Sequence, residues 1–208
     1  MFVPPPVEEM RAALSDWERF VHYPPPMPLL VRCALFHYQF ETIHPFLDGN
    51  GRIGRLLIVL FLVEQGDLPQ PFLYTSAYFE QHKSEYYDRL QAVRERVELA
   101  EWLRFFLTAV RVQAIDALER AERLADLRET YRTRVTSETR SRAHEVVDVL
   151  FENPVVTTRF VAERLGMTIQ GAKNLVRQLE ALGIVREVDQ IPGRSKRWEA
   201  EEIMRTVS

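Results

Sequence analysis

The chain has 208 residues, 46% of them hydrophobic and 11% aromatic, so it can bury a core and is not a disordered chain. Its 27 basic and 30 acidic residues give a formal net charge of -3, which excludes a strongly basic nucleic-acid coat but not a local basic patch. The single cysteine, Cys33, excludes an intrachain disulfide and suits a reducing cytosol. Cys33 lies among apolar residues, as a buried core thiol would.

The N-terminal part begins with three prolines at positions 4–6 and then reads as a series of helices. The second of these is apolar nearly all round, which is typical of a central helix. No signal peptide is visible, and the longest apolar stretch, residues 56–63, is too short to span a bilayer. We therefore expect a cytoplasmic protein with no membrane partner. The predicted helices cover residues 7–23, 29–44, 52–65, 81–96 and 98–127, and residues 72–79 are ambiguous between helix and strand.

The C-terminal part has a different character, because its helices are short and two strand patterns follow them. Helices are predicted at residues 144–151, 158–165 and 168–182, and strands at residues 184–188 and 196–199. Three helices and a hairpin make a winged helix-turn-helix. We divide the chain into a domain at residues 1–110, a connecting helix at residues 111–136 and a winged helix-turn-helix domain at residues 137–208.

Residues 44–55, HPFLDGNGRIGR, concentrate polar and charged side chains between two apolar helices. An EF-hand calcium loop is excluded because its first and last positions would hold Phe46 and Leu57, where carboxylates are required. A plain glycine turn would not explain why His44, Asp48 and two arginines stand together. A Walker loop would need a Gly-Lys-Ser/Thr ending that the sequence lacks.

An anion cradle explains these residues best. Gly49 and Gly51 have no Cβ atoms, so phosphates could approach the backbone, and the next helix points its free N–H groups to the same place. Arg52 and Arg55 lie three residues apart on one face and can both bind phosphate oxygens. Three further residues have candidate roles. Asp48 could bind Mg²⁺, Asn50 could donate a hydrogen bond to a phosphate oxygen, and His44 could act as a general base.

The same stretch matches the HxFx[DE]GNGRxxR signature of Fic-domain proteins at every fixed position, and the chain resembles the bacterial branch of that family with a C-terminal winged helix. FVPPP, HYQFETIHPF, Tyr86-Tyr87 and the aromatic residues near Trp102 add to the resemblance. It implies a mainly α protein: a Fic helical bundle followed by a winged helix-turn-helix. It also implies transfer of AMP from ATP to a Ser, Thr or Tyr hydroxyl of a target protein. The intact GNGR differs from the branch that phosphorylates its targets.

The resemblance assigns a role to each motif residue. His44 would deprotonate the target hydroxyl, Asp48 would hold Mg²⁺, and a buried Phe46 would anchor the loop. Arg52 would hold the β- and γ-phosphates, and Arg55 the γ-phosphate. The further implied contacts with ATP are an anion hole at Gly49, Asn50 and Gly51 and an adenine pocket at Tyr86 and Tyr87, for which simple helix packing is the alternative. The other histidines (His22, His37, His82 and His144) are interpreted as surface or packing residues.

Proteins of this family that resemble the chain carry two elements before the FVPPP segment. One is a β-hairpin flap that aligns the target peptide, and the other is an inhibitory helix with an [ST]xxxE[GN] motif. The chain starts at Met1-Phe2-Val3-Pro4, so we expect both to be absent. Two alternatives to a transferase therefore stay open: a DNA-binding regulator whose Fic core only senses nucleotide, and an inactive interaction module. His44 favours the transferase, since sensing alone needs no base.

The third helix of the C-terminal part and its wing present polar and basic residues that could meet base edges and phosphates of DNA. These are Gln170, Lys173, Asn174 and Arg177 on the helix and Arg194, Lys196 and Arg197 on the wing. Contact with protein, including homodimerisation, is the alternative for this domain.

Overall fold

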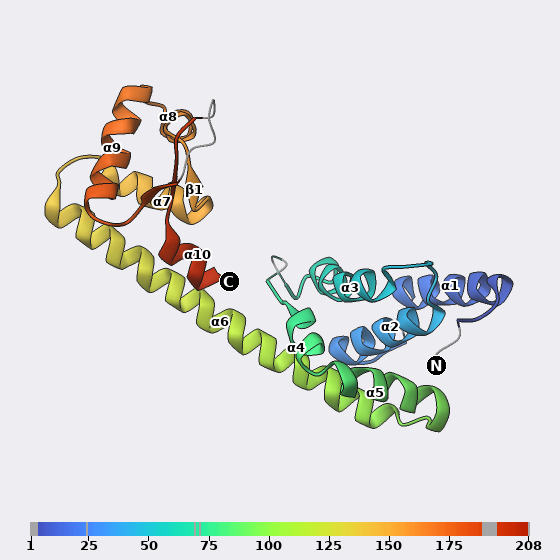
Figure 1. The fold of residues 1–208 in the computed structure, drawn as a ribbon. Coiled ribbons are helices and arrows are strands. Elements are labelled where there is room, and N and C mark those ends of the chain that lie inside the picture. Colours follow the sequence, from blue (N-terminus) through green and yellow to red (C-terminus); the bar gives the residue numbers. More distant parts are fainter. Residues whose placement is uncertain (1–3, 24, 69, 71, 189–194, 208) are drawn as a thin grey trace. The chain divides into compact units, whose positions relative to one another are not determined.

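The computed structural model describes residues 4–23, 25–68, 70, 72–188 and 195–207. Ten helices and three short strands lie within these residues (Figure 1). The chain divides into two compact units, Met1–Ala117 and Leu118–Ser208. The fold is mainly α, as predicted. Among the described residues, no helix is both long and apolar enough to cross a membrane.

The N-terminal unit is a helical bundle with α2 at its centre. Helix α2 buries residues on more than one side, and two tryptophans hydrogen-bond to its backbone. Trp17 Nε1 donates to the Phe36 carbonyl at 2.9 Å, and Trp102 Nε1 donates to the Ala34 carbonyl at 3.1 Å. The bundle consists of α1 (Val7–His22), α2 (Leu29–Ile43), α3 (Asn50–Glu64), α4 (Thr75–Gln81), α5 (Lys83–Arg96) and the first part of α6 (Leu99–Glu138).

Cys33 lies in this core with no exposed surface, as expected. Burial raises the pKa of its thiol to about 12, so the thiolate form is not populated at neutral pH. Cys33 is therefore a packing residue.

The C-terminal unit is a winged helix-turn-helix. Thr157 and Thr168 cap α8 and α9 by accepting backbone N–H groups, each at 3.1 Å, and Gly166 turns between the helices with φ of +61°. The strands form an antiparallel sheet in the order β1-β3-β2. Its elements are α7 (Ala143–Glu152), β1 (Val155–Val156), α8 (Thr158–Leu165), α9 (Ile169–Ala181), β2 (Arg186–Val188), β3 (Arg197–Glu199) and α10 (Glu201–Val207), with the last part of α6.

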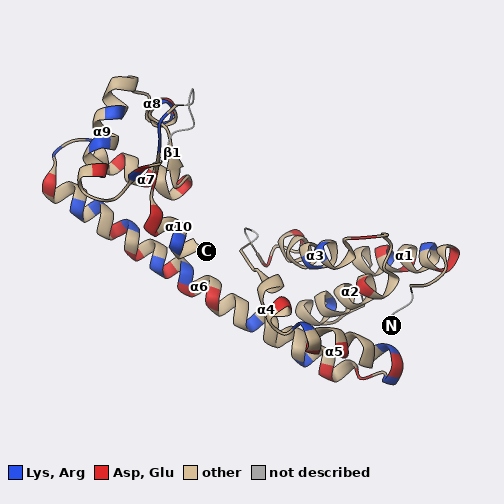
Figure 2. Cartoon of the chain, in the orientation of Figure 1, with Lys and Arg blue, Asp and Glu red and all other residues tan. Residues whose placement is uncertain are grey.

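Four elements differ from the sequence-based prediction. Helix α6 continues to Glu138 instead of ending near residue 127, because Tyr131 and Val135 belong to the core of the C-terminal unit. The ambiguous residues 72–79 contain the start of α4. Strand β1 and helix α10 were not predicted at all. Acidic and basic residues alternate along the helices, including α6 (Figure 2), which agrees with the small net charge.

Candidate functional site

The stretch rich in charged residues forms the loop between α2 and the start of α3. Helix α2 ends at Ile43, and His44 follows in the left-handed conformation with φ of +51°. The His44 N–H donates to the Phe40 carbonyl at 3.0 Å, so it still belongs to the hydrogen-bonded end of α2. A helix end thereby fixes the backbone that carries the histidine.

Asn50 closes the loop on itself. Its Oδ1 accepts the Phe46 N–H at 2.9 Å, and its Nδ2 donates to the Phe46 carbonyl at 2.6 Å. The Asn50 side chain is only 2% exposed, so these bonds satisfy a polar group that would otherwise be costly to bury. The side-chain amide of Asn50 thus stabilises the loop. The sequence pattern had instead predicted a hydrogen bond from this side chain to a phosphate. Only the backbone N–H of Asn50 stays at the open end of α3.

Phe46 was expected to be buried, and this expectation was wrong. Its side chain is 48% exposed, and its ring contacts Phe40 with the centroids 6.4 Å apart. The reason is the Asn50 bridge, which ties down the backbone of Phe46 and leaves the ring at the rim. Phe46 still anchors the loop, but through its peptide groups.

The start of α3 has the form of an anion site. Gly49 caps the helix with φ of +85°, a conformation that favours glycine. The first amides of a helix have no intrahelical acceptor and lie at the positive end of its dipole. The arginines lie over the glycines: Arg52 Nη2 is 3.4 Å from the point that a Gly49 Cβ would occupy, and Arg55 Nη1 is 3.1 Å from that of Gly51. Two guanidinium groups and the helix end therefore supply positive charge at one place.

Asp48 is the one carboxylate of this loop. Its Oδ1 accepts the Gly49 N–H at 2.7 Å, and its Oδ2 pairs with Arg52 at 3.2 Å, both on an exposed surface. The described residues contain no cluster of three His, Cys, Asp or Glu side chains that could enclose a metal ion. A single open carboxylate fits Mg²⁺, which usually keeps several waters and binds one or two carboxylates together with substrate phosphates.

Comparison with known proteins identifies two domains in the chain. Residues 1–62 match the Fic/DOC family. The chain carries a Fic domain. Residues 144–199 match a family described as an HTH DNA binding domain, so a helix-turn-helix domain follows the Fic domain.

Several relatives of the Fic domain are named protein adenylyltransferases. The chain is 39% identical over 74 residues to a probable protein adenylyltransferase of Aquifex aeolicus, a match that covers 34% of this chain and 22% of the relative. It is 42% identical over 62 residues to the protein adenylyltransferase Fic of Aedes aegypti, covering 30% of this chain and 11% of the relative. It is 33% identical over 95 residues to the Drosophila ananassae protein of the same name, a match that covers 45% of this chain and 18% of the relative.

The fold also resembles that of a solved structure. A Fic family protein from Desulfovibrio desulfuricans G20 superposes with a TM-score of 0.53 at 20% sequence identity, over 95% of this chain and 56% of the other. The chain thus spans little more than half of that protein, and its matches span 22% or less of the three adenylyltransferases.

The two predicted adenine-pocket tyrosines lie in the N-terminal unit, in different surroundings. Tyr86 is 2% exposed and packs between Phe79 and Trp102, whereas Tyr87 is 53% exposed. The Tyr86 hydroxyl lies 2.9 Å from Nε2 of His37, whose Nδ1 lies 3.0 Å from the Gly54 carbonyl. Because a carbonyl only accepts, Nδ1 carries the proton and Nε2 accepts from Tyr86. Burial lowers the pKa of His37 to about 3, in keeping with a neutral packing histidine.

Three residues around the loop of residues 44–50, here called the Fic loop, were not identified from the sequence. Glu41 is a buried carboxylate on α2, only 5% exposed, and burial raises its pKa to about 7. Arg94 on α5 donates to the Glu41 carbonyl and to Thr42 Oγ1, both at 3.2 Å, and so holds the last turn of α2 before His44. Gly54 lies where a Cβ would overlap Glu41 Oε1. The sequence did contain a sign of Glu41, because an acidic residue inside an otherwise apolar helix pattern indicates a buried charge with a specific role.

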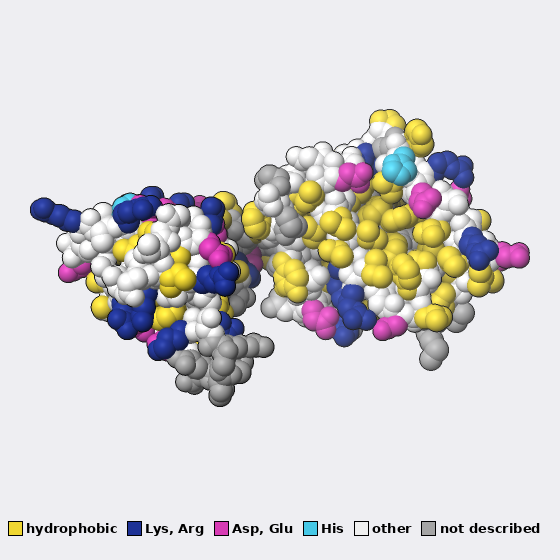
Figure 3. All heavy atoms as spheres, turned by 90° about the horizontal axis from the view of Figure 1, so that it is seen from above, with side chains coloured by type: hydrophobic (Ala, Val, Ile, Leu, Met, Phe, Trp, Pro, Cys, Tyr) yellow, Lys and Arg dark blue, Asp and Glu magenta, His cyan; other side chains and the backbone are white. Residues whose placement is uncertain are grey.

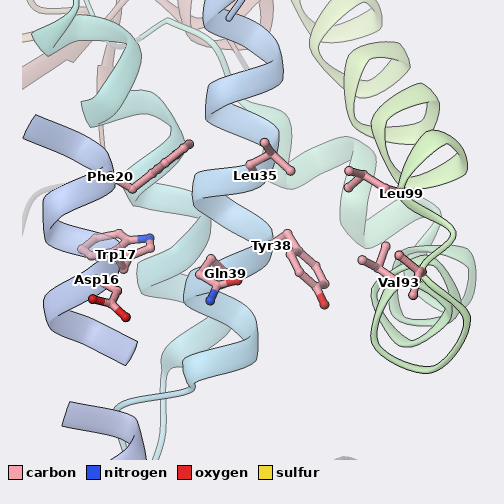
Figure 4. A pocket seen from close by; sticks show the side chains of 9 residues that line it. Asp16, Trp17, Phe20, Leu35, Tyr38, Gln39, Val93 and Leu99 are labelled. Carbon is pink, nitrogen blue, oxygen red and sulfur yellow. The ribbon is translucent and has the colours of Figure 1, made fainter. Parts of the chain in front are cut away.

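An apolar pocket of about 390 Å³ lies elsewhere in the bundle (Figure 4). Side chains of α1, α2, α5 and α6 line it, among them Trp17, Tyr38 and Leu99, and no motif residue lines it. Apolar side chains also gather on one face of the N-terminal unit (Figure 3).

The predicted DNA-contacting residues of the helix-turn-helix domain lie on α9 and the wing. Gln170, Asn174 and Arg177 are exposed, Lys173 is half-buried, and Gln170 Nε2 donates to Asn174 Oδ1 at 3.0 Å. On the wing, Lys196 forms an ion pair with Glu187 at 2.7 Å, and Arg197 is exposed on β3. Arg194 lies outside the described residues.

Proposed function

We propose that the Fic domain transfers AMP from ATP to a Ser, Thr or Tyr hydroxyl of a target protein. The observation that carries this proposal is the convergence of His44, the guanidinium groups of Arg52 and Arg55 and the open end of α3 on one short loop. A base beside a phosphate-binding helix end is what transfer to a hydroxyl requires.

In the proposed reaction, His44 takes the proton of the target hydroxyl. The hydroxyl oxygen forms a bond to the α-phosphorus, the bond from that phosphorus to its bridging oxygen breaks, and pyrophosphate leaves. The amides of Gly49, Asn50 and Gly51 would bind phosphate oxygens, with Arg52 on the β- and γ-phosphates and Arg55 on the γ-phosphate. Mg²⁺, held by Asp48, would neutralise phosphate charge.

Tyr87 is the better placed of the two tyrosines to meet the adenine ring, because its ring is exposed. Tyr86 would act behind it, since the two rings pack with centroids 5.2 Å apart. Phe46 would contribute through the loop that Asn50 closes.

The test is incubation of the chain with α-labelled ATP, Mg²⁺ and a cell lysate, beside His44→Ala. We expect labelled protein bands with the wild type and a loss of about 10²–10⁴-fold in the variant, the usual contribution of a general base. Binding of ATP by the variant serves as the control for folding. Label that persists in His44→Ala removes the histidine from its proposed role.

We also propose that the helix-turn-helix domain binds duplex DNA, since residues 144–199 match a DNA-binding family and α9 exposes Gln170, Asn174 and Arg177. Both activities would then operate in the cytoplasm, where ATP and DNA are available. Salt-dependent retardation of random duplex supports this proposal. Absence of retardation at low salt favours the alternative, contact with protein or a second copy of the chain.

A further inference from the structure

The polar residues under the Fic loop form a connected group inside an apolar bundle. His37 and Glu41 lie four residues apart on α2, so their side chains point to the same side of the helix, toward α3. His37 contacts Gly54 through its ring, and Glu41 lies against the same glycine with its carboxylate. Two polar side chains of α2 thus contact α3 at Gly54, shortly after the loop.

Glu41 is the member of this group that packing does not explain. Its Oε1 atom is buried and receives no hydrogen bond from any described residue. A buried carboxylate is costly unless positive charge or hydrogen bonds compensate it. Gly54 keeps open the space that this carboxylate occupies, since a side chain at residue 54 would overlap Glu41 and approach Phe40 at 3.1 Å. The close approach of α2 and α3 is therefore built around a carboxyl group.

The compensating charges come from two arginines. Arg94 is fixed by its hydrogen bonds to the Glu41 carbonyl and to Thr42. Arg55 approaches from α3, and its Nη1 is 3.1 Å from the point of a Gly51 Cβ, while Glu41 Oε1 is 4.0 Å from that same point. The two arginines attract the carboxylate and oppose the rise in its pKa that burial causes. Arg55 also faces the positive end of α3, which repels a guanidinium.

We infer that Glu41 is a positioning residue for Arg55, whose guanidinium it holds over the start of α3 in the orientation that binds the terminal phosphate of a nucleoside triphosphate. The inference rests on the proposed function for the identity of the nucleotide. It adds a residue outside the motif to the phosphate site and explains why Gly54 has no side chain. With a neutral side chain at residue 41, the positive end of α3 and the guanidinium of Arg52 would repel Arg55, and no nearby carboxylate of α2 would offset this repulsion.

Equilibrium binding of ATP and ADP by the full chain tests this role. We expect the wild type to prefer ATP over ADP, and Glu41→Gln to bind ATP about tenfold more weakly with unchanged affinity for ADP, the size of one charge-assisted contact. Glu64→Gln, at the far end of α3, is the matched control and keeps the wild-type preference. Arg55→Ala loses the same preference, and adding Glu41→Gln to it causes no further loss.

A purely structural role for Glu41 would lower ATP and ADP affinity together, and that result overturns the inference. An unchanged preference in Glu41→Gln, or no preference in the wild type, overturns it as well. If Glu41→Gln does not fold, Glu41→Asp keeps the charge at a shorter reach, and we expect an intermediate preference for ATP; a wild-type preference in that variant counts against the inference. Failure of the proposed function would be seen in a different experiment, as the absence of labelled protein after incubation with α-labelled ATP.

Discussion

The cores of the two units differ in kind. The buried cluster of the C-terminal unit contains only hydrophobic side chains among the residues described, with Leu150 and Trp198 as examples. All the buried polar side chains identified in the structure belong to the N-terminal unit, and His37, Glu41 and Asn50 lie directly beneath or within the Fic loop. Burying such groups costs free energy, so their concentration in one place indicates that they hold the site. The N-terminal unit therefore has an apolar core with a polar group beneath its loop, whereas the described core of the C-terminal unit is apolar throughout.

The largest effect should come from the apolar core. Leu150 is fully buried in the C-terminal unit, and Leu150→Ala should lower the free energy of unfolding of that unit by about 2–5 kcal/mol, because it removes transfer energy and leaves a cavity. Urea denaturation measures the change. Ile169→Ala, at an exposed position of α9, should stay within about 0.5 kcal/mol. A loss below about 1 kcal/mol for Leu150→Ala would mean that this core is loosely packed.

Gly54→Ala probes the polar group of the N-terminal unit. An alanine normally stabilises a helix relative to glycine by about 1 kcal/mol, but here its Cβ would overlap Glu41 and crowd Phe40. We therefore expect a net loss of about 1–3 kcal/mol in thermal or urea unfolding. The double variant Glu41→Ala, Gly54→Ala removes the overlap and should recover part of that loss. A stabilising Gly54→Ala would contradict the observed approach of α2 and α3.

The pH dependence of stability separates the two polar side chains. The pKa of Glu41 is raised to about 7, so the folded state holds a proton that the unfolded state has lost, and stability falls as pH rises from about 4.5 to 7. The pKa of His37 is lowered to about 3, so stability rises with pH from about 3 to 6.5. The two slopes oppose each other in the wild type.

Glu41→Gln removes the first slope alone. Relative to the wild type, the variant should gain stability as pH rises from about 4.5 to 7, and the difference should be constant above that range. Urea unfolding of both chains at matched pH values measures it. A pH-independent difference would mean that the Glu41 carboxyl titrates normally in the folded chain.

The smallest effect should be seen at the surface of the C-terminal unit. Arg177→Ala should weaken binding to random duplex and reduce the slope of log affinity against log salt by about 1, the contribution of one phosphate contact. Arg205→Ala, which removes an exposed arginine of α10 paired with Glu201, is the control and should leave the slope unchanged. Equal slopes for the wild type and Arg177→Ala would exclude that residue from the DNA surface.

The sequence allowed the helices and the loop to be predicted because their determinants are local. Helical spacing, prolines and glycines mark α1, α2 and α3, and the loop residues from His44 to Arg55 are neighbours in the chain. The contact of Glu41 with Gly54 could not be predicted, because it depends on how closely two helices approach. The burial of Phe46 was misjudged because the Asn50 bridge, a matter of loop geometry, leaves its ring exposed. Strand β1 has only two residues, too few to show the alternation of apolar and polar residues by which strands are predicted.

The most direct test of the proposed transfer uses ATP labelled at either the α- or the γ-phosphate in otherwise identical reactions with Mg²⁺ and lysate. AMP transfer leaves the α-phosphorus on the target protein and releases the γ-phosphorus in pyrophosphate, so we predict label from α-labelled ATP alone, lost in His44→Ala. Label from the γ-phosphate would show phosphate transfer, and absence of His44-dependent label from both would show that the chain transfers neither group; either result would contradict the account.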